Sequence, residues 1–128
     1  MIYLDTSVAL AHLLAEDRVP PASLWEHTVV SSRLLEYELW TRIHAGGLTG
    51  SHGDNTRALL GRIAFLELTP VVLARALEPF PSPVRTLDAL HLASIEFLRA
   101  QLVGVELASY DQRQIGVARR LSIAIADV

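Results

Sequence analysis

Three aspartates of this chain stand where apolar, strand-like runs give way to helical patterns. They are Asp5, Asp88 and Asp111, half of the six aspartates in the sequence, and a fourth acid, Glu38, lies within an apolar helical stretch. In an open parallel α/β sheet the carboxyl ends of the strands line one crevice, and ligands bind there. Carboxylates that converge in such a crevice repel one another unless a hard cation holds them. The pattern therefore predicts an acidic Mg²⁺ or Mn²⁺ site.

Each acid also has an ordinary structural interpretation. Asp5 and Asp111 stand where an acid can cap a helix or favour the positive end of its dipole. Glu38 lies four residues before Arg42, so an ion pair along one helix face is the alternative. Glu36 is a competing acid on the same segment, but the two glutamates diverge by about 200° at 3.6 residues per turn. Glu38 falls on or beside the apolar face.

Asp88 and His91 are three residues apart and share one face of an apolar helix. A carboxylate in a buried helix needs a partner, which favours a functional role for Asp88. For His91 two interpretations stay open: a core histidine bonded to the backbone, or a catalytic group. The other histidines show no metal-binding spacing and are expected on the surface or in packing contacts; they are His12, His27, His44 and His52.

The elements that position these residues alternate between strand and helix along the chain. Strands are expected at residues 2–5, 28–31, 65–68, 104–109 and 123–126. Helices are expected at 8–15, 22–26, 54–65, 70–76, 87–100 and 112–121, with a longer one running from Ser32 through Ile43 to Gly46. Thr6 or Ser7, Ser32 and Thr86 are the expected helix caps. Three prolines between residues 78 and 83 predict a loop.

This alternation predicts an α/β fold, a three-layer α/β/α sandwich around a central, mostly parallel sheet. The 128 residues, 51% apolar and 20% charged, fit one globular domain spanning 1–128. The chain has no cysteine, which excludes a disulfide framework and a thiolate metal site. No apolar run is long enough for a membrane span or a secretory signal, so we expect a cytoplasmic protein without a membrane partner.

Charge composition narrows the chemistry further. The net charge of −3 provides no strong global attraction for nucleic acid, although a bound cation would offset the acids locally. All 11 basic residues are arginine. Receiver domains and haloacid-dehalogenase-like phosphatases also place an Asp after the first strand, but both families rely on a lysine, which this chain lacks. No glycine-rich phosphate motif follows a strand, which disfavours a P-loop or dinucleotide site.

Four segments, in order and spacing, resemble the PIN-domain family, especially the VapC-type toxins of bacterial toxin–antitoxin pairs. They are Ile2-Tyr3-Leu4-Asp5-Thr6-Ser7, Ser32 to Leu39, Leu87-Asp88-Ala89-Leu90-His91-Leu92-Ala93, and Ala108-Ser109-Tyr110-Asp111. The resemblance covers essentially the whole chain. It implies a Mg²⁺- or Mn²⁺-dependent endoribonuclease that cleaves single-stranded RNA in the bacterial cytoplasm. It also implies a homodimer and a small antitoxin, which forms a hetero-oligomer with the toxin and covers the active-site groove.

Residue by residue, the resemblance assigns the metal-binding and catalytic acids to Asp5, Glu38, Asp88 and Asp111. Our hypothesis is that Asp5 and Asp88 hold the principal cation, that Glu38 orients or deprotonates the attacking water, and that Asp111 completes the shell or a second metal site. The expected substrate contacts are Thr6, Ser109, Arg85 and Arg113, with Gln112 a weaker candidate; plain surface charge is the alternative for both arginines. A non-catalytic interaction module with the same fold is the competing function.

Overall fold

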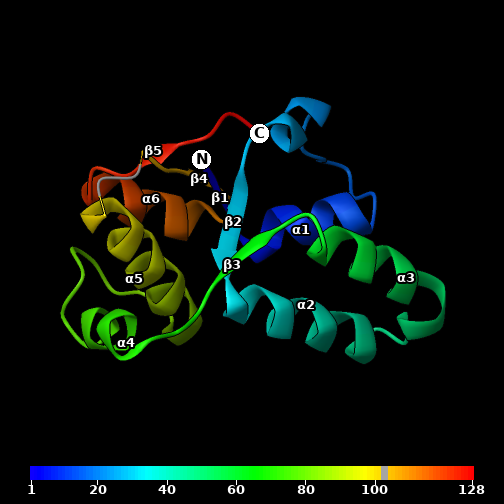
Figure 1. Ribbon diagram of the computed structural model, residues 1–128, viewed down its shortest axis with the longest axis horizontal. Helices are drawn as coiled ribbons and strands as arrows, with labels where there is room; N and C mark the ends of the chain where they lie inside the picture. Colours follow the sequence, from blue (N-terminus) through cyan, green and yellow to red (C-terminus); the bar gives the residue numbers. More distant parts are fainter. Residues whose placement is uncertain (102–103) are drawn as a thin grey trace.

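The computed structural model describes residues 1–101 and 104–128 (Figure 1). The strands are β1 (Ile2–Leu4), β2 (Val29–Ser32), β3 (Ala64–Leu66), β4 (Glu106–Ala108) and β5 (Ala124–Ile125). The α-helices are α1 (Thr6–Leu13), α2 (Arg33–Ala45), α3 (Thr49–Leu60), α4 (Pro70–Ala76), α5 (Thr86–Ala100) and α6 (Gln112–Arg120), and Ala22–Glu26 forms a short 3₁₀ helix, η1. Strands and helices alternate, as the sequence predicts.

The five strands form one parallel sheet in the order β3-β2-β1-β4-β5. The central strand β1 pairs with β2 through Tyr3 and Val30, and with β4 through Tyr3 and Leu107. The first strand in the sequence therefore lies between the next strand and one that comes about a hundred residues later. The predicted α/β fold with a central parallel sheet is confirmed.

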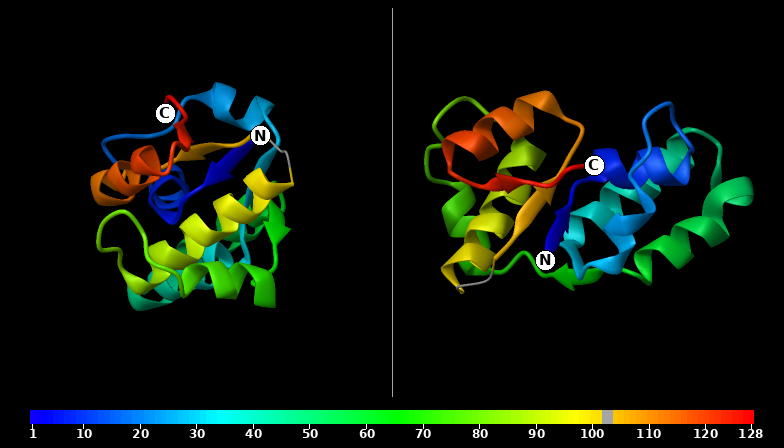
Figure 2. Two further views of the ribbon diagram at one scale, coloured as in Figure 1. Left: turned by 90° about the vertical axis from the view of Figure 1, so that its left-hand side faces the viewer. Right: turned by 90° about the horizontal axis from the view of Figure 1, so that it is seen from above.

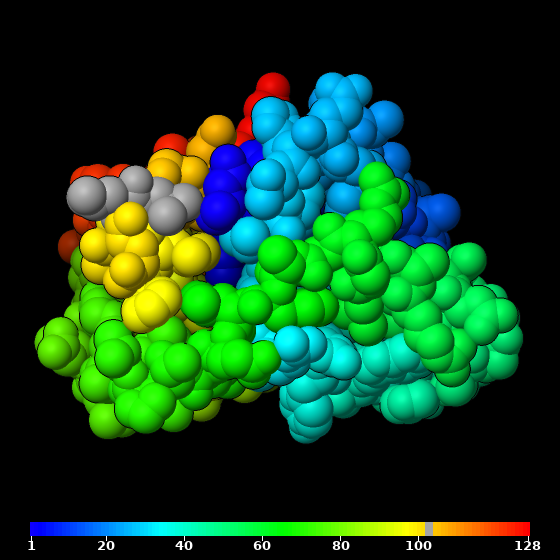
Figure 3. All heavy atoms as spheres, viewed as in Figure 1, coloured from blue at the N-terminus to red at the C-terminus, as the bar shows by residue number. Residues whose placement is uncertain are grey.

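Helices cover both faces of this sheet. Figures 1 and 2 show α1, α2 and α3 on one side and α4, α5 and α6 on the other. The alternation of side chains along β1 matches this arrangement, because Ile2 and Leu4 pack in the core beneath α1 and α2 while Tyr3 packs in the core beneath α5 and α6. In the space-filling view, the green segment of α3, β3 and α4 forms much of the near face (Figure 3).

The first helix begins at Thr6, two residues before the predicted start at Val8. The predicted caps Thr6 and Ser7 are wrong: Asp5 is the N-cap, with an extended backbone (φ −83°, ψ 151°), and its carboxylate accepts from the Ser7 N–H at 3.2 Å. The helix ends at Leu13, short of the predicted Ala15, because Ala15 has a left-handed backbone with φ of 48°. Asp5 is thus both a helix cap and a residue at the end of β1.

Two further helix starts test the capping predictions. Ser32 caps α2 as expected, since its Oγ accepts from the Leu34 N–H at 3.0 Å. Thr86 does not cap α5: it is the first helical residue, and Arg85 holds the cap position without a side-chain hydrogen bond. The extended residue before the helix is Arg85 (φ −73°, ψ 157°), and only a residue with that backbone can act as the cap.

The prediction for α3 was wrong at both ends. The helix begins at Thr49, five residues before the expected start, and ends at Leu60, after which β3 begins at Ala64. Glycine and serine are weak helix formers, which is why the segment reads as a loop. The helix is attached to the core through its later part, where Thr56 and Leu59 are buried. No helix within the described residues is long and apolar enough to cross a membrane.

Candidate metal-binding site

The four predicted acids come from four elements that meet at the carboxyl edge of the sheet. Asp5 follows β1, and Asp111 stands three residues after β4; the two strands are neighbours through Leu4 and Ala108. Glu38 lies on α2, and Asp88 lies in the first turn of α5. The parallel sheet thus brings together acids that are far apart in the sequence, where such folds bind ligands.

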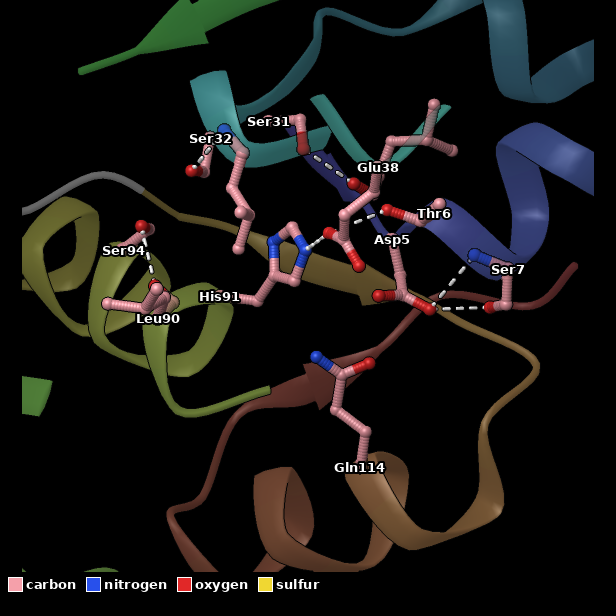
Figure 4. A network of polar contacts seen from close by, with 12 residues as sticks. Asp5, Thr6, Ser7, Ser31, Ser32, Glu38, Leu90, His91, Ser94 and Gln114 are labelled. Carbon is pink, nitrogen blue, oxygen red and sulfur yellow. Dashed lines mark hydrogen bonds and ion pairs between the residues drawn. The ribbon is translucent and has the colours of Figure 1, made fainter. Parts of the chain in front are cut away.

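Asp5 is 5% exposed, and the described residues contact only one of its two oxygens. Oδ2 accepts from the Ser7 N–H at 3.2 Å, from Ser7 Oγ at 2.5 Å and from Ser109 Oγ at 3.1 Å. Ser7 Oγ in turn accepts from the Tyr110 N–H at 2.9 Å, so its proton is directed at Asp5. Figure 4 shows the other oxygen of Asp5 on the side of Glu38 and His91. The carboxylate is therefore fixed through one oxygen, and Oδ1 points toward the site.

Glu38, rather than Glu36, is the glutamate of the site. Its Oε1 accepts from Thr6 Oγ1 at 3.0 Å and lies 2.5 Å from His91 Nε2. Glu36 instead pairs with Arg33 at 2.9 Å on the exposed side of α2. The alternative ion pair between Glu38 and Arg42 does not form among the described residues. Because the two glutamates point in different directions around α2, Glu36 lies on the surface and Glu38 faces the site.

His91 connects Glu38 to the central strand. The imidazole is 1% exposed, and its Nδ1 lies 2.7 Å from Tyr3 Oη, which accepts from the Ser32 N–H at 3.1 Å. Burial opposes a charged imidazolium, but the hydrogen bond to Glu38 and the negative charges of the nearby acids raise the pKa of His91 above its usual value. Burial raises the pKa of the Tyr3 phenol as well. His91 is held by hydrogen bonds to two side chains, and not by the backbone hydrogen bond that one interpretation of the sequence expected.

Asp88 has a buried oxygen, Oδ2, that accepts no hydrogen bond from any described residue. Its closest basic atom is Arg85 Nε at 3.7 Å, too far for a hydrogen bond. Burial raises the pKa of Asp88, and the negative charges of Asp111 and Asp5 raise it further. A buried carboxylate oxygen without a hydrogen bond is costly, so a closer positive charge or a proton would stabilise this atom.

Asp111 caps α6 with one oxygen and faces the site with the other. Oδ1 accepts from the backbone N–H groups of Arg113 at 3.0 Å and of Gln114 at 3.4 Å. Oδ2 lies 3.7 Å from Arg85 Nη2, so the guanidinium of Arg85 is within ion-pair distance of both acids, through Nη2 to Asp111 and through Nε to Asp88. The capping interpretation of Asp111 is correct, and it leaves the second oxygen available.

The donor set fits a hard divalent cation. All four acids supply carboxylate oxygens, and Asp88 Oδ2 is a buried acceptor that the described residues leave unpaired. Within the described residues, no three His, Cys, Asp or Glu side chains are grouped closely enough to form a coordination shell by themselves. Mg²⁺ typically binds through one or two carboxylates and keeps several of its waters, so a closed shell is not required.

The predicted substrate contacts divide into two kinds. Thr6 and Ser109 are 8% and 2% exposed, and their hydroxyls bond to Glu38 and Asp5, so they position the acids. Arg85 is exposed beside Asp88 and Asp111, whereas Arg113 is exposed and forms no ion pair with any described acid.

Sequence reasoning missed three polar side chains of the site. They are Tyr3, Ser7 and Gln114, which contact His91, Asp5 and Ser109 respectively. Tyr3 lies inside the strand and looks like a core residue. Gln114 was overlooked in favour of Gln112, which the structure places on the surface. The spacing of Gln114, three residues after the acid that caps α6, was the available signal.

The sequence profile of the PIN domain matches residues 2–120. The chain is 28% identical over 133 residues to Ribonuclease VapC47 of Mycobacterium tuberculosis (strain CDC 1551 / Oshkosh), covering 98% of this chain and 96% of that protein. It is 30% identical over 131 residues to Ribonuclease VapC35 of M. tuberculosis (strain ATCC 25618 / H37Rv), covering 98% and 95% respectively.

Two solved structures share the fold. A toxin–antitoxin complex from Klebsiella pneumoniae has a chain that aligns with a TM-score of 0.61 at 16% identity, with 90% of each chain covered. The crystal structure of M. tuberculosis VapC20, a sarcin–ricin loop cleaving toxin, aligns with a TM-score of 0.58 at 18% identity, covering 91% of this chain and 96% of that one.

Proposed function

Because the chain belongs to the PIN domain family, we propose that it is a Mg²⁺- or Mn²⁺-dependent endoribonuclease for single-stranded RNA and the toxin of a VapBC-type toxin–antitoxin pair. The names of its relatives, which are ribonucleases, support this proposal. The observation that carries it is Asp88 Oδ2, a buried carboxylate oxygen that accepts no hydrogen bond from any described residue, on a side chain whose pKa is raised by burial and by the charges of Asp111 and Asp5. A cation at this place would relieve the cost of burying that charge.

The residues have distinct roles in the proposed hydrolysis. A bound divalent cation supplies a Lewis acid for the phosphate and lowers the pKa of water. Asp5 and Asp88 hold the cation, and Asp111 completes the site. Glu38 orients the attacking water and takes its proton, and His91 and Thr6 hold its carboxylate in place. Arg85 binds a phosphate oxygen, because its exposed guanidinium stands beside the two acids that would face the substrate.

An apolar groove supports a protein partner in addition to RNA. It has a volume of about 770 Å³ and lies between α4, the proline-rich loop and the start of α5, where Leu77, Pro81 and Leu90 are among its lining residues. Leu77, which follows the end of α4, is 88% exposed. Val71, in the first turn of α4, is 64% exposed. Exposed apolar side chains of this kind mark interaction sites. We assign the groove to the cognate antitoxin and expect the toxin to form a homodimer within the complex.

The test compares cleavage of a mixed cellular RNA pool by the wild type, Asp5→Asn and Asp88→Asn, with Mg²⁺ and with chelator. Asp54→Asn is the matched control, because that aspartate is fully exposed on α3 and pairs only with Arg57. We expect discrete cuts by the wild type and the control, lost on chelation and in both site variants, while all four proteins remain folded.

The other outcomes separate the competing functions. Equal cutting by all four proteins would trace the activity to a contaminant. A full-activity Asp5→Asn protein would refute the assigned site. If nothing is cut and Mn²⁺ leaves the melting temperature of the wild type unchanged, the non-catalytic interaction module becomes the better description.

A further inference from the structure

Gln114 is a buried polar residue of the site to which the proposed hydrolysis assigns no role. It lies in the first turn of α6 and is 1% exposed. Figure 4 shows its carboxamide directed toward Asp5, with the nitrogen on the side of α5. Its Nε2 makes no hydrogen bond to any described residue. A buried amide that lacks a partner destabilises a fold, so this side chain calls for an explanation.

The hydrogen bonds around Ser109 show that the described residues cannot satisfy this carboxamide. Ser109 Oγ has one proton, and it lies 3.1 Å from Asp5 Oδ2 and 3.3 Å from Gln114 Oε1. The carboxylate is nearer and carries a negative charge, so it takes the proton. Ser109 Oγ also accepts from the Asp111 N–H at 3.0 Å, which leaves one of its lone pairs free.

If the carboxamide is turned by 180°, every one of these polar groups has a hydrogen-bond partner except the carboxamide oxygen itself. Nε2 then donates to the free lone pair of Ser109 Oγ, which lies beside that end of the amide. The carboxamide oxygen then takes the place of Nε2, on the side of α5, and is left without a partner among the described residues. In either orientation one polar end of Gln114 has no protein partner, so the site provides a position for a ligand atom next to Gln114.

We propose that Gln114 is a positioning residue for the cation of this site, its carboxamide oxygen accepting a hydrogen bond from a water of the cation's hydration shell. This inference rests on the proposed function. Waters polarised by a divalent cation are strong donors, and Mg²⁺ keeps several of them when it binds to proteins. A carboxamide oxygen suits such a donor, whereas it would repel a phosphate oxygen. Ser109 then links Gln114, Asp5 and Asp111 into one support for the cation.

The experiment measures Mn²⁺ binding without RNA, by electron paramagnetic resonance of the free ion. Gln114→Met keeps the length of the side chain and removes both polar ends, and Gln114→Glu keeps the acceptor. We expect Gln114→Met to weaken Mn²⁺ binding roughly tenfold, the usual effect of losing an outer-shell partner. Its melting temperature in chelator should equal or exceed that of the wild type, because an unpaired buried amide is gone. Gln114→Glu should bind Mn²⁺ at least as tightly as the wild type.

The failures of the two proposals are distinguishable. Unchanged Mn²⁺ affinity in Gln114→Met refutes the role of Gln114 and leaves the acidic site intact. Equal losses in Gln114→Met and Gln114→Glu also refute it, since the acceptor would then be irrelevant. If the wild type and Asp88→Asn bind Mn²⁺ equally, or neither binds it, the cation site itself is refuted, and the inference falls with it.

Discussion

Tyr3 Oη lies 2.7 Å from His91 Nδ1, a contact that joins the middle of the central strand to α5 across 88 residues of sequence. In the neutral imidazole, Tyr3 donates to Nδ1, and the proton on Nε2 is donated to Glu38 Oε1 at 2.5 Å. Tyr3 therefore selects the tautomer of His91, and His91 orients the carboxylate that we assign to the attacking water. Hydrogen-bond partners behind a metal-site or catalytic side chain fix its orientation in this way.

Replacing His91 by Phe should lower kcat for RNA cleavage by roughly 10- to 100-fold, because Glu38 loses the donor that orients it. KM should change little, since His91 is buried and does not reach the substrate. Tyr3→Phe keeps the imidazole and should have a smaller effect on kcat. Steady-state kinetics on a defined cleaved RNA measure both. A rise in KM at constant kcat would instead show that the variant had disturbed substrate binding.

Asp88 makes the stability of the protein depend on pH. Its pKa is raised in the folded state, so its contribution to stability is present below the unfolded pKa and is lost as the pH rises through the folded pKa. In chelator, Asp88→Asn should therefore melt at a higher temperature than the wild type at neutral pH. The difference should vanish below about pH 3.9, the unfolded value for aspartate. Asp54→Asn is the exposed control, and a lower melting temperature for Asp88→Asn at neutral pH would contradict the argument.

Arg85 should have opposite effects on cation binding and on RNA binding. Its guanidinium lies 3.7 Å from Asp88 and from Asp111, where its charge competes with a bound cation. Arg85→Gln should tighten Mn²⁺ binding by roughly two- to fivefold, the scale of exposed ion pairs, and raise KM for RNA. The charge-matched control is Arg119→Gln, on the exposed side of the last turn of α6. Mn²⁺ titration and steady-state kinetics at one ionic strength measure both effects, and unchanged KM would remove Arg85 from the substrate site.

Substitutions at two leucines should have separate effects, one on the stability of the fold and the other on binding of the partner. Leu107 on β4 is fully buried, so Leu107→Ala should lower the free energy of unfolding by roughly 2–5 kcal/mol. Leu77 is 88% exposed beside the apolar groove, and Leu77→Ala should change it by no more than about 0.5 kcal/mol. Urea unfolding measures both values. Leu77→Ala should also weaken binding of the antitoxin while leaving RNA cleavage unchanged, and unaltered affinity would exclude the groove as its docking site.

The placement of the acids was predictable because each has a local signal. Asp5 and Asp111 follow apolar runs, Asp88 opens an apolar helix, and the helical repeat separates Glu38 from Glu36. The contacts of Tyr3 with His91 and of Gln114 with Ser109 depend on side chains that meet only in the folded chain. Sequence periodicity carries no information on such long-range pairs. The start of α3 was missed for a different reason, since residues 49–53 contain weak helix formers and are nevertheless helical.

The position of β1 in the sheet has a consequence for biosynthesis. Ile2 pairs with Glu106, 104 residues further along the chain, so β1 leaves the ribosome long before its neighbour β4. A growing chain that stops short of β4 already contains Asp5, Glu38 and Asp88, but it lacks the strand that brings Ser109 to Asp5. Contacts between strands this far apart in the sequence form slowly. A nascent chain would therefore carry no assembled site until the segment from β4 to Asp111 has been translated.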